Sequence, residues 1–278
     1  MSTTSTAPAL IIDANEVVGR RNILLVTLDS LRYDVARAAH VAGATPNLSV
    51  LLPPEGWQAR HTSGSFTYPA HHAIFAGFLP KPAQPGTPDS RLFECRPPEG
   101  KVVRPTTYVI DGDNVIRGLA DVGYQTVCIG GVDYFAGQTP LGSVFPSMFA
   151  ESHWSTLFSN TEPDSTRHQV DQALTVIDQK DEQLLMMFVN VSATHVPHHH
   201  YLPTPDGTDG FASQIAALSY ADEHLGRLLT ALPATGSWLV VICADHGDAF
   251  GDDGYHGHVN AHPAVMTVPY VEALVDAR

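Results

Sequence analysis

The sequence predicts an α/β fold, a doubly wound and mainly parallel sheet with helices on both faces, over one domain of residues 1–278. Three continuous apolar runs, at 22–28, 183–191 and 238–244, have the length and composition of strands that are buried on both faces. Stretches with helical periodicity, such as 211–232, separate them. Strands that alternate with helices along a chain indicate a parallel sheet covered on both faces.

The first strand is expected at 22–28 and leads directly into Asp29. The elements expected after it are a helix from about residue 31, a helix over 45–52, a strand over 57–61 and a helix over 70–76. Pro69 fits the first turn of that last helix, because the amide that proline lacks would be unpaired there, and Gly77 fits its end.

Residues 80–105 are rich in proline and glycine and show neither periodicity, so we expect an irregular surface excursion there. The elements expected beyond it are strands over 106–110 and 124–129, a helix over 114–121, a helix over 165–179, the strand at 183–191, the helix at 211–232 and the strand at 238–244. The folded core is expected to span about residues 20–275.

The charge of the chain argues against nucleic acid as a partner. Its formal net charge is −14, and its only lysines are Lys81, Lys101 and Lys180. Binding to a phosphate backbone depends on basic surface, which this composition does not supply. The expected partner is a small molecule, and the sequence leaves the oligomeric state open.

The cysteines and the N-terminus lead us to expect a soluble, cytoplasmic protein. Cys95, Cys128 and Cys243 are odd in number, and two of them lie in apolar runs, which is typical of small core residues in a reducing compartment. Residues 1–7 are polar, and no run approaches the ~18 apolar residues of a membrane span. We therefore expect no membrane partner.

Thr67 stands just ahead of the expected helix at 70–76, where unpaired amides and the positive end of the helix dipole favour an anion or an ionising hydroxyl. This effect contributes about 0.3–1 kcal/mol, which is too little to make threonine a nucleophile without a metal ion. The alternative is that Thr67 only caps the helix, which is the commonest role of a threonine at that place.

Three candidate metal ligands follow two of the buried strands. Asp29 ends the first strand, and Asp245 and His246 follow the strand at 238–244. Because the carboxyl ends of parallel strands face one crevice, these side chains and the Thr67 oxygen could complete the four-coordination of one divalent cation. Mixed oxygen and nitrogen donors suit zinc or manganese better than magnesium or calcium. The alternative role of Asp29 and Asp245 is to cap a helix or a turn.

Two histidine-rich segments are candidates for contacts with a substrate. His195 comes soon after a buried strand and is expected to reach the site, whereas the histidines at 198–200 are expected in solvent. The candidates in the second segment are His256, His258 and His262. One of the first two could donate to a substrate oxygen or protonate a leaving group, and the sequence does not decide which one faces the site.

Together these stretches resemble the sulfatase-like branch of the alkaline phosphatase superfamily, in the family's order over about residues 22–275. The matching residues are Leu28-Asp29-Ser30-Leu31-Arg32, Thr45-Pro46-Asn47-Leu48, Thr67-Tyr68-Pro69 with Gly77, Gly123-Tyr124, His195-Val196-Pro197, Leu225-Gly226-Arg227-Leu228-Leu229, Asp245-His246-Gly247 and Val268-Pro269. Each match is weak by itself, but the ordered set is specific.

The resemblance implies a doubly wound α/β fold with a catalytic metal site. The metal ligands that it implies are Asp29, Asp245, His246 and the covalent nucleophile Thr67. It also implies that His195 and His256 contact the substrate, as in phosphoethanolamine transferases and lipoteichoic acid synthases. The segment from Thr67 to His71 resembles, in addition, the nucleophile segment of nucleotide pyrophosphatase/phosphodiesterases.

Several departures from the family pattern narrow the implied activity. Sulfatases carry a Cys or Ser in place of Thr67, which argues against their route to the cleavage of sulfate esters. Ser30 replaces the second aspartate of the sulfatase pair, and Gly131 stands where a lysine is expected. Two-metal members have an aspartate at the position of Val191, so we expect one metal ion per chain.

The leading hypothesis is a metal-dependent hydrolase of phosphate monoesters or diesters that works through a covalent intermediate on Thr67. An enzyme with the same fold could instead be a transferase that passes the group to an alcohol rather than to water. The non-enzymatic alternative is a protein that binds an anion or a partner without turnover. The presence of Asp29, Thr67, Asp245 and His246 argues against that alternative.

Overall fold

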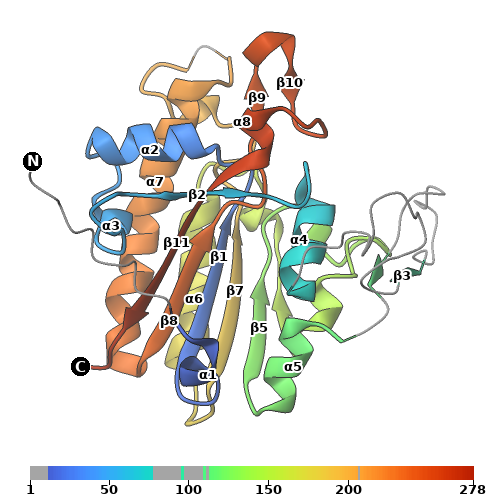
Figure 1. The fold of residues 1–278 in the computed structure, drawn as a ribbon, viewed down its shortest axis with the longest axis vertical. Helices are drawn as coiled ribbons and strands as arrows, with labels where there is room; N and C mark the ends of the chain where they lie inside the picture. The colour runs from blue at the N-terminus through green and yellow to red at the C-terminus, as the bar shows by residue number, and fades with distance from the viewer. Residues whose placement is uncertain (1–11, 78–94, 97–108, 111–112, 206) are drawn as a thin grey trace, which may run out of the picture.

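A seven-stranded sheet, in the order β2-β11-β8-β1-β7-β5-β6, forms the centre of the computed structural model, which describes residues 12–77, 95–96, 109–110, 113–205 and 207–278 (Figure 1). Its strands are β1 (Asn22–Leu28), β2 (Gln58–His61), β5 (Gln125–Ile129), β6 (Glu151–His153), β7 (Leu185–Val191), β8 (Trp238–Cys243) and β11 (Thr267–Val275). Two small sheets pair β3 (Cys95–Arg96) with β4 (Val109–Ile110) and β9 (Ala249–Phe250) with β10 (His256–Gly257).

Five neighbouring strands, from β8 to β6, run parallel to one another, as the sequence predicts. The registers place Leu28 of β1 opposite Val191 of β7, and Thr27 of β1 opposite Cys243 of β8. The chain therefore leaves β1, β7 and β8 at the same edge of the sheet.

The sequence did not predict β11, which pairs antiparallel with both β8 and β2. Its third residue is Pro269, and a proline within an apolar run argues against a strand because it cannot donate to the ladder. In the structure the carbonyl of Pro269 still accepts a hydrogen bond of 3.2 Å from the amide of Ala244. Pro269 is therefore tolerated in a strand inside the sheet.

Helices cover both faces of this sheet, which confirms the doubly wound architecture. They are α1 (Ala14–Val17), α2 (Tyr33–Val41), α3 (Pro46–Ser49), α4 (Thr67–Ala76), α5 (Val115–Asp121), α6 (Ser165–Asp178), α7 (Phe211–Ala231) and α8 (Pro263–Met266). On one face Leu24 and Val26 of β1 pack in a core with apolar residues of α2, α6 and α7. On the other face Ile23 packs in a second core with residues of α4 and α5.

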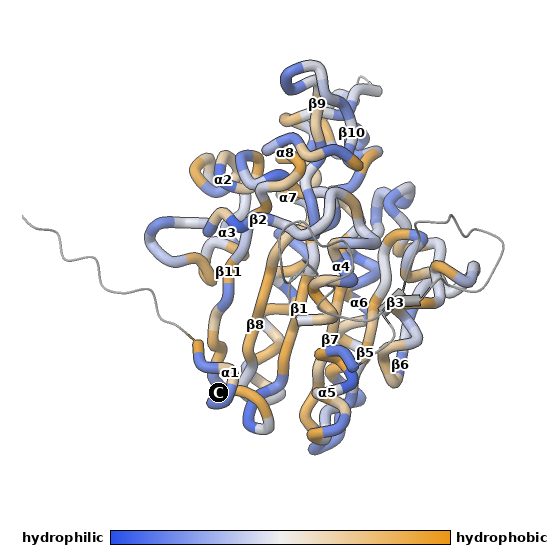
Figure 2. The backbone as a smooth tube through the Cα atoms, turned by 45° about the vertical axis from the view of Figure 1, so that its right-hand side comes forward, coloured by the Kyte–Doolittle hydropathy of each residue, from blue (hydrophilic) through white to orange (hydrophobic). Residues whose placement is uncertain are grey.

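Strands β1 and β8 are hydrophobic along most of their length (Figure 2). Burial on both faces leaves few positions where a polar side chain could reach water, so the runs are continuous rather than alternating. Cys128 in β5 is buried, and neither it nor Cys243 in β8 forms a disulfide. No helix in the described ranges combines the length and the apolar character needed to cross a membrane.

Some sequence-based expectations fall on residues outside those that the structure describes. They are the polar start at 1–7, most of the excursion at 80–105 and most of the strand at 106–110, of which the structure describes only 95–96 and 109–110.

Candidate functional site

Thr67 is the first residue of α4, a helix that begins a little earlier than the sequence predicts. The preceding residue, Phe66, is extended (φ −162°, ψ 168°), and its side chain makes no capping hydrogen bond. Pro69 is still within the first turn, where backbone amides have no partner in the helix. Gly77 ends the helix with φ 78°, as predicted. Thr67 is therefore not the cap of α4, and its hydroxyl is not used for that purpose.

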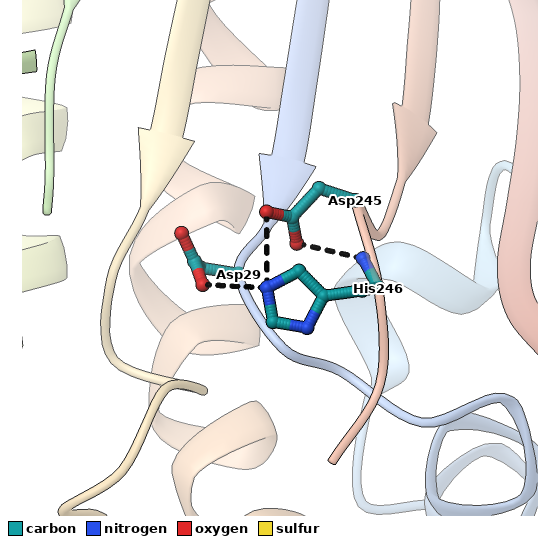
Figure 3. A group of neighbouring side chains, drawn as sticks. All are labelled: Asp29, Asp245 and His246. Carbon is teal, nitrogen blue, oxygen red and sulfur yellow. Dashed lines mark hydrogen bonds and ion pairs between the residues drawn. The ribbon is translucent and has the colours of Figure 1, made fainter. Parts of the chain in front are cut away.

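Asp29, Asp245 and His246 converge at the carboxyl ends of the adjacent strands β1 and β8 (Figure 3). Their candidate ligand atoms all lie within 4.8 Å of one another, and all three side chains are fully buried. Nε2 of His246 lies 3.8 Å from Oδ1 of Asp29 and 3.5 Å from Oδ2 of Asp245. Oγ1 of Thr67 lies 3.5 Å from the same nitrogen. Thr67 thus lies beside the group that Asp29, Asp245 and His246 form, next to Nε2 of His246.

The hydrogen bonds of this group fit a bound cation. Oδ1 of Asp245 accepts from the backbone amides of Ser30 (3.1 Å) and His246 (2.9 Å), whereas its Oδ2 is buried with no hydrogen-bond donor. Nδ1 of His246 donates to the carbonyl of Gly247 (2.8 Å), which leaves a lone pair on Nε2. A buried carboxylate oxygen without a partner is costly, and a metal ion would supply one.

Burial and the neighbouring carboxylate of Asp29 raise the pKa of Asp245 to about 7. Burial acts in the same direction on Asp29, but the nearby histidines His195 and His246 and a hydrogen bond from Asn190 outweigh it and lower its pKa. The buried carboxylates of Asp29 and Asp245 lie close together, so they repel each other when both are ionised. A divalent cation between them would favour the ionised form of both.

Ser30 supports the geometry although it departs from the family pattern. Its backbone has φ 61°, a left-handed conformation that is uncommon for residues other than glycine. In this conformation its amide reaches Asp245, and its hydroxyl donates to Oδ1 of Asp29 at 3.1 Å. Through these two hydrogen bonds Ser30 links the carboxylates that follow β1 and β8.

Two histidines lie beside this group. The ring of His258 is centred 4.7 Å from that of His246, and the ring of His195 is centred 5.5 Å from that of His258. Asn160 donates to the carbonyl of Val196 at 2.7 Å and lies 3.1 Å from Nδ1 of His195, which fixes that loop. Both rings are partly exposed and so are accessible to a ligand.

The structure shows which of His256 and His258 lies next to the candidate ligands, a choice that the sequence left open. His256 is exposed in strand β10, where it pairs with Phe250. His262 accepts a hydrogen bond from the amide of Ala264 and lies 3.3 Å from a carboxylate oxygen of Asp253. Of these candidates His258 is the one that contacts His246, so the geometry favours it over the His256 that the resemblance implied.

Two further residues near the site were not recognised from the sequence. Asp248 is only 2% exposed, and its Oδ1 lies 3.7 Å from Nδ1 of His258, whose pKa it raises. His198 was expected in solvent but is fully buried, with Nδ1 2.8 Å from the hydroxyl of Ser213. Burial lowers the pKa of His198 to about 4, so it is neutral at pH 7. The spacing from Asp245 to Asp248 was visible, but nothing local shows that Asp248 is buried.

Comparisons with known proteins identify the family and the fold of this chain. A profile of the sulfatase family matches residues 21–273 of the chain. No curated protein matches the sequence. Among solved structures, the C-terminal periplasmic domain of phosphoethanolamine transferase EptC from Campylobacter jejuni aligns with a TM-score of 0.62 at 11% identity, over 92% of this chain and 79% of that one.

Two other structures are similar to the same extent. The corresponding domain of EptC from Escherichia coli, in complex with Zn, has a TM-score of 0.61 at 16% identity and covers 93% of this chain and 73% of its own. The lipoteichoic acid synthase LtaP from Listeria monocytogenes has a TM-score of 0.60 at 15% identity, over 91% of this chain and 65% of that one. At these identities the likeness establishes the fold.

The expected cytoplasmic location is contradicted by these comparisons, because the similar EptC structures are periplasmic domains. The expectation relied on unpaired cysteines and a polar N-terminus. A buried thiol such as that of Cys128 is shielded from oxidants in any compartment, and burial raises its pKa to about 12. Unpaired core cysteines therefore do not identify the compartment.

Proposed function

The chain belongs to the sulfatase family of the alkaline phosphatase superfamily, and on that premise we propose that it is a metal-dependent enzyme that transfers a substituted phosphoryl group from a phosphodiester to an alcohol through Thr67. The observation that carries this proposal is the position of the Thr67 hydroxyl, 3.5 Å from the nitrogen around which the acidic ligands gather. A hydroxyl used only for packing would not need to be at that point.

The residues that would hold the metal are Asp29, Thr67, Asp245 and His246. The orphaned oxygen of Asp245 and the lone pair on Nε2 of His246 support this assignment. A donor set of three oxygens and one nitrogen suits zinc, the ion in the similar structure of Escherichia coli EptC. A divalent ion at this place supplies positive charge to ionise the hydroxyl and to stabilise charge on the equatorial phosphoryl oxygens.

Thr67 takes part in two successive displacements at phosphorus. In the first, a bond forms from Oγ1 to phosphorus as the bond to the leaving oxygen breaks; the threonine hydroxyl loses its proton, and the leaving oxygen takes one up. In the second, the hydroxyl oxygen of the acceptor loses its proton and displaces Oγ1 from phosphorus, and Oγ1 takes up a proton. His258 lies next to His246, and His195 lies next to His258, so both rings are close enough to contact the oxygens of a substrate at this group.

The charges around the site favour a diester over a monoester. A divalent cation between the carboxylates of Asp29 and Asp245 leaves almost no net positive charge. Arg32, the nearest cation along the chain, is already paired with Asp34 and Asp252. A monoester carries about −1.5 to −2 charges at pH 7, whereas a diester carries a single one. The diester is therefore the better match.

The names of the similar structures, a phosphoethanolamine transferase and a lipoteichoic acid synthase, support an alcohol as the acceptor. The hydrolase hypothesis from the sequence shares the first displacement and differs only in that water completes the second. Competition between the two acceptors therefore distinguishes these activities.

The test uses the full chain loaded with zinc and three chromogenic substrates: bis(p-nitrophenyl) phosphate, p-nitrophenyl phosphate and p-nitrophenyl sulfate. We expect nitrophenol release from the diester first, and glycerol should divert the product to a glyceryl ester detectable by mass spectrometry. Release with water as the only acceptor would make the protein a hydrolase. Zinc binding without release from any ester would contradict the enzyme proposal and favour a binding protein.

A further inference from the structure

A chain of buried hydrogen bonds lies behind the candidate metal site and connects Asp29 with the helix that carries Thr67. Its members are Asn190 of β7, Thr27 of β1 and His71 of α4, and all three are fully buried. The amide of Asn190 donates to Oδ2 of Asp29 at 3.1 Å and to the hydroxyl of Thr27 at 3.1 Å. Thr27 in turn lies 3.1 Å from Nε2 of His71.

The donor and acceptor of each hydrogen bond can be assigned from the two ends of this hydrogen-bond chain. The backbone carbonyl of Thr67, 2.8 Å from Nδ1 of His71, can only accept, so Nδ1 carries the proton. Nε2 of the neutral ring must then accept, and the hydroxyl of Thr27 donates to it. The Thr27 oxygen consequently accepts from Asn190. Each donor hydrogen in this hydrogen-bond chain therefore has one acceptor.

Asn190 is fixed at the other end. Its Oδ1 accepts from the amide of Val132 at 3.2 Å, which sets the orientation of the side-chain amide and turns both of its hydrogens towards Thr27 and Asp29. This position of Asn190 requires a glycine at residue 131, because a Cβ there would overlap the backbone carbonyl oxygen and Oδ1 of Asn190. The glycine found where the family has a lysine therefore accommodates Asn190.

The imidazole of His71 is held in place by aromatic rings. The rings around it, with their centroids 5.1 to 5.8 Å away, are those of Phe75, Phe135, Phe145 and Phe188. Burial among them lowers the pKa of His71, which agrees with the neutral form that the hydrogen bonds require. An apolar enclosure excludes water that could replace a lost bond, so the polar chain is sensitive to the loss of any member.

We propose that His71, Thr27 and Asn190 are positioning residues that fix the separation between Asp29 and Thr67 and thereby set the affinity of the site for its metal. This inference rests on the proposed metal site. The chain ties an oxygen of Asp29 to the backbone of Thr67 through three side chains on three different elements, β7, β1 and α4. Partners of this kind, which orient metal ligands, affect metal affinity by about 10- to 100-fold.

The test compares two substitutions at Thr27 in the full chain. Thr27→Val keeps the branched shape that suits a buried strand but removes the hydroxyl, whereas Thr27→Ser keeps the hydroxyl and loses only a methyl group. Competition with a chromophoric chelator measures the dissociation constant for zinc. We expect a loss of affinity of about 10- to 100-fold in Thr27→Val and a value within a few-fold of the unsubstituted protein in Thr27→Ser.

A matched control separates positioning from a general loss of stability. Leu24→Ala alters the same strand and destabilises the opposite core without touching the hydrogen-bond chain. It should lower the melting temperature and leave zinc affinity unchanged. The inference is overturned if Leu24→Ala weakens zinc binding as much as Thr27→Val does, or if Thr27→Val binds zinc as tightly as the unsubstituted protein.

A second measurement does not depend on metal. ¹⁵N NMR of the histidine side chains in metal-free protein should show His71 as the neutral tautomer protonated at Nδ1, with an Nε2 signal that shifts in Thr27→Val. A cationic ring or the opposite tautomer would contradict the hydrogen-bond chain itself. An unsubstituted protein that binds no zinc would instead contradict the proposed function, so the two failures are distinguishable.

Discussion

At the scale of single residues, the proposed chemistry depends on the position of the Thr67 hydroxyl more than on its intrinsic reactivity. A threonine hydroxyl is a weak nucleophile, and the first turn of α4 adds only a small electrostatic gain. The side chain nevertheless lies next to Nε2 of His246, the nitrogen that Asp29 and Asp245 also approach. Substitutions at this position therefore separate metal binding from group transfer.

We expect Thr67→Ala to abolish nitrophenol release from a diester, with a loss of about 10³-fold or more in kcat/KM. Zinc should remain bound, because the other three ligands are retained. Thr67→Ser should keep measurable activity, since it preserves the hydroxyl. Single-turnover kinetics and metal analysis check both statements. Activity in Thr67→Ala close to that of the unsubstituted protein would exclude a covalent step on this residue.

The pair His256 and His258 offers a matched comparison. His258 is packed against His246, whereas His256 is exposed in β10. We expect His258→Ala to lower kcat/KM by about 10²- to 10⁴-fold, the usual range for a group that transfers or donates a proton. His256→Ala should leave kcat/KM unchanged. The reverse result would restore the assignment that the family resemblance implied.

At the scale of elements, the β9–β10 hairpin leads directly to His258, and Arg32 holds it. The Arg32 guanidinium bonds both carboxylate oxygens of Asp252 (2.7 and 3.0 Å) and lies 5.2 Å from the ring centre of Phe250. Arg32 lowers the pKa of Asp252 to about 2. Arg32, which follows β1, thus links this part of the chain to the β9–β10 hairpin, which follows β8.

Loss of this ion pair should move the hairpin without unfolding the sheet. In Asp252→Asn we expect faster amide hydrogen exchange over 249–257 and a several-fold lower kcat, because His258 is then less well placed, while zinc affinity stays the same. Glu16→Gln, which removes the exposed pair with Arg20, is the control and should change neither property. Unchanged exchange in the hairpin would show that Arg32 does not restrain it.

At the scale of the whole molecule, metal removal should make folding sensitive to pH. The pKa of Asp245 is raised from 3.8 to about 7 in the folded protein, so the protonated carboxyl favours the folded state. That contribution is complete below about 3.8 and is lost as the pH rises through about 7. Folding of the metal-free chain is therefore least favoured, with respect to this group, above neutral pH.

Calorimetric melting with a chelator at pH 5 and pH 8 measures this effect. We expect a lower melting temperature at pH 8 without metal and recovery when zinc is added, because the cation compensates the ionised carboxylates. Asp245→Asn should remove the difference that depends on this carboxyl. If zinc raises the melting temperature of Asp245→Asn as much as that of the unsubstituted protein, Asp245 is not a ligand.

The position of the strands could be predicted from the sequence because burial on both faces has a local signature. β1 was predicted with its observed limits, Asn22–Leu28, and β7 and β8 differ from the prediction by only one or two residues at an end. Parallel strands deliver the residues after them to one edge of the sheet. The sequence therefore predicts that Asp29 and the Asp245-His246 pair lie close together.

Only the tertiary structure decided which side chains meet across segments far apart in the chain. No local pattern distinguishes His258 from His256, and none reveals that His71 and Asn190 belong to one hydrogen-bond chain with Thr27. Strand β11 was missed for the same kind of reason, because its pairing with β8 outweighs the propensity of Pro269. Hydrophobic periodicity is a property of neighbouring residues, whereas packing between distant segments depends on the whole fold.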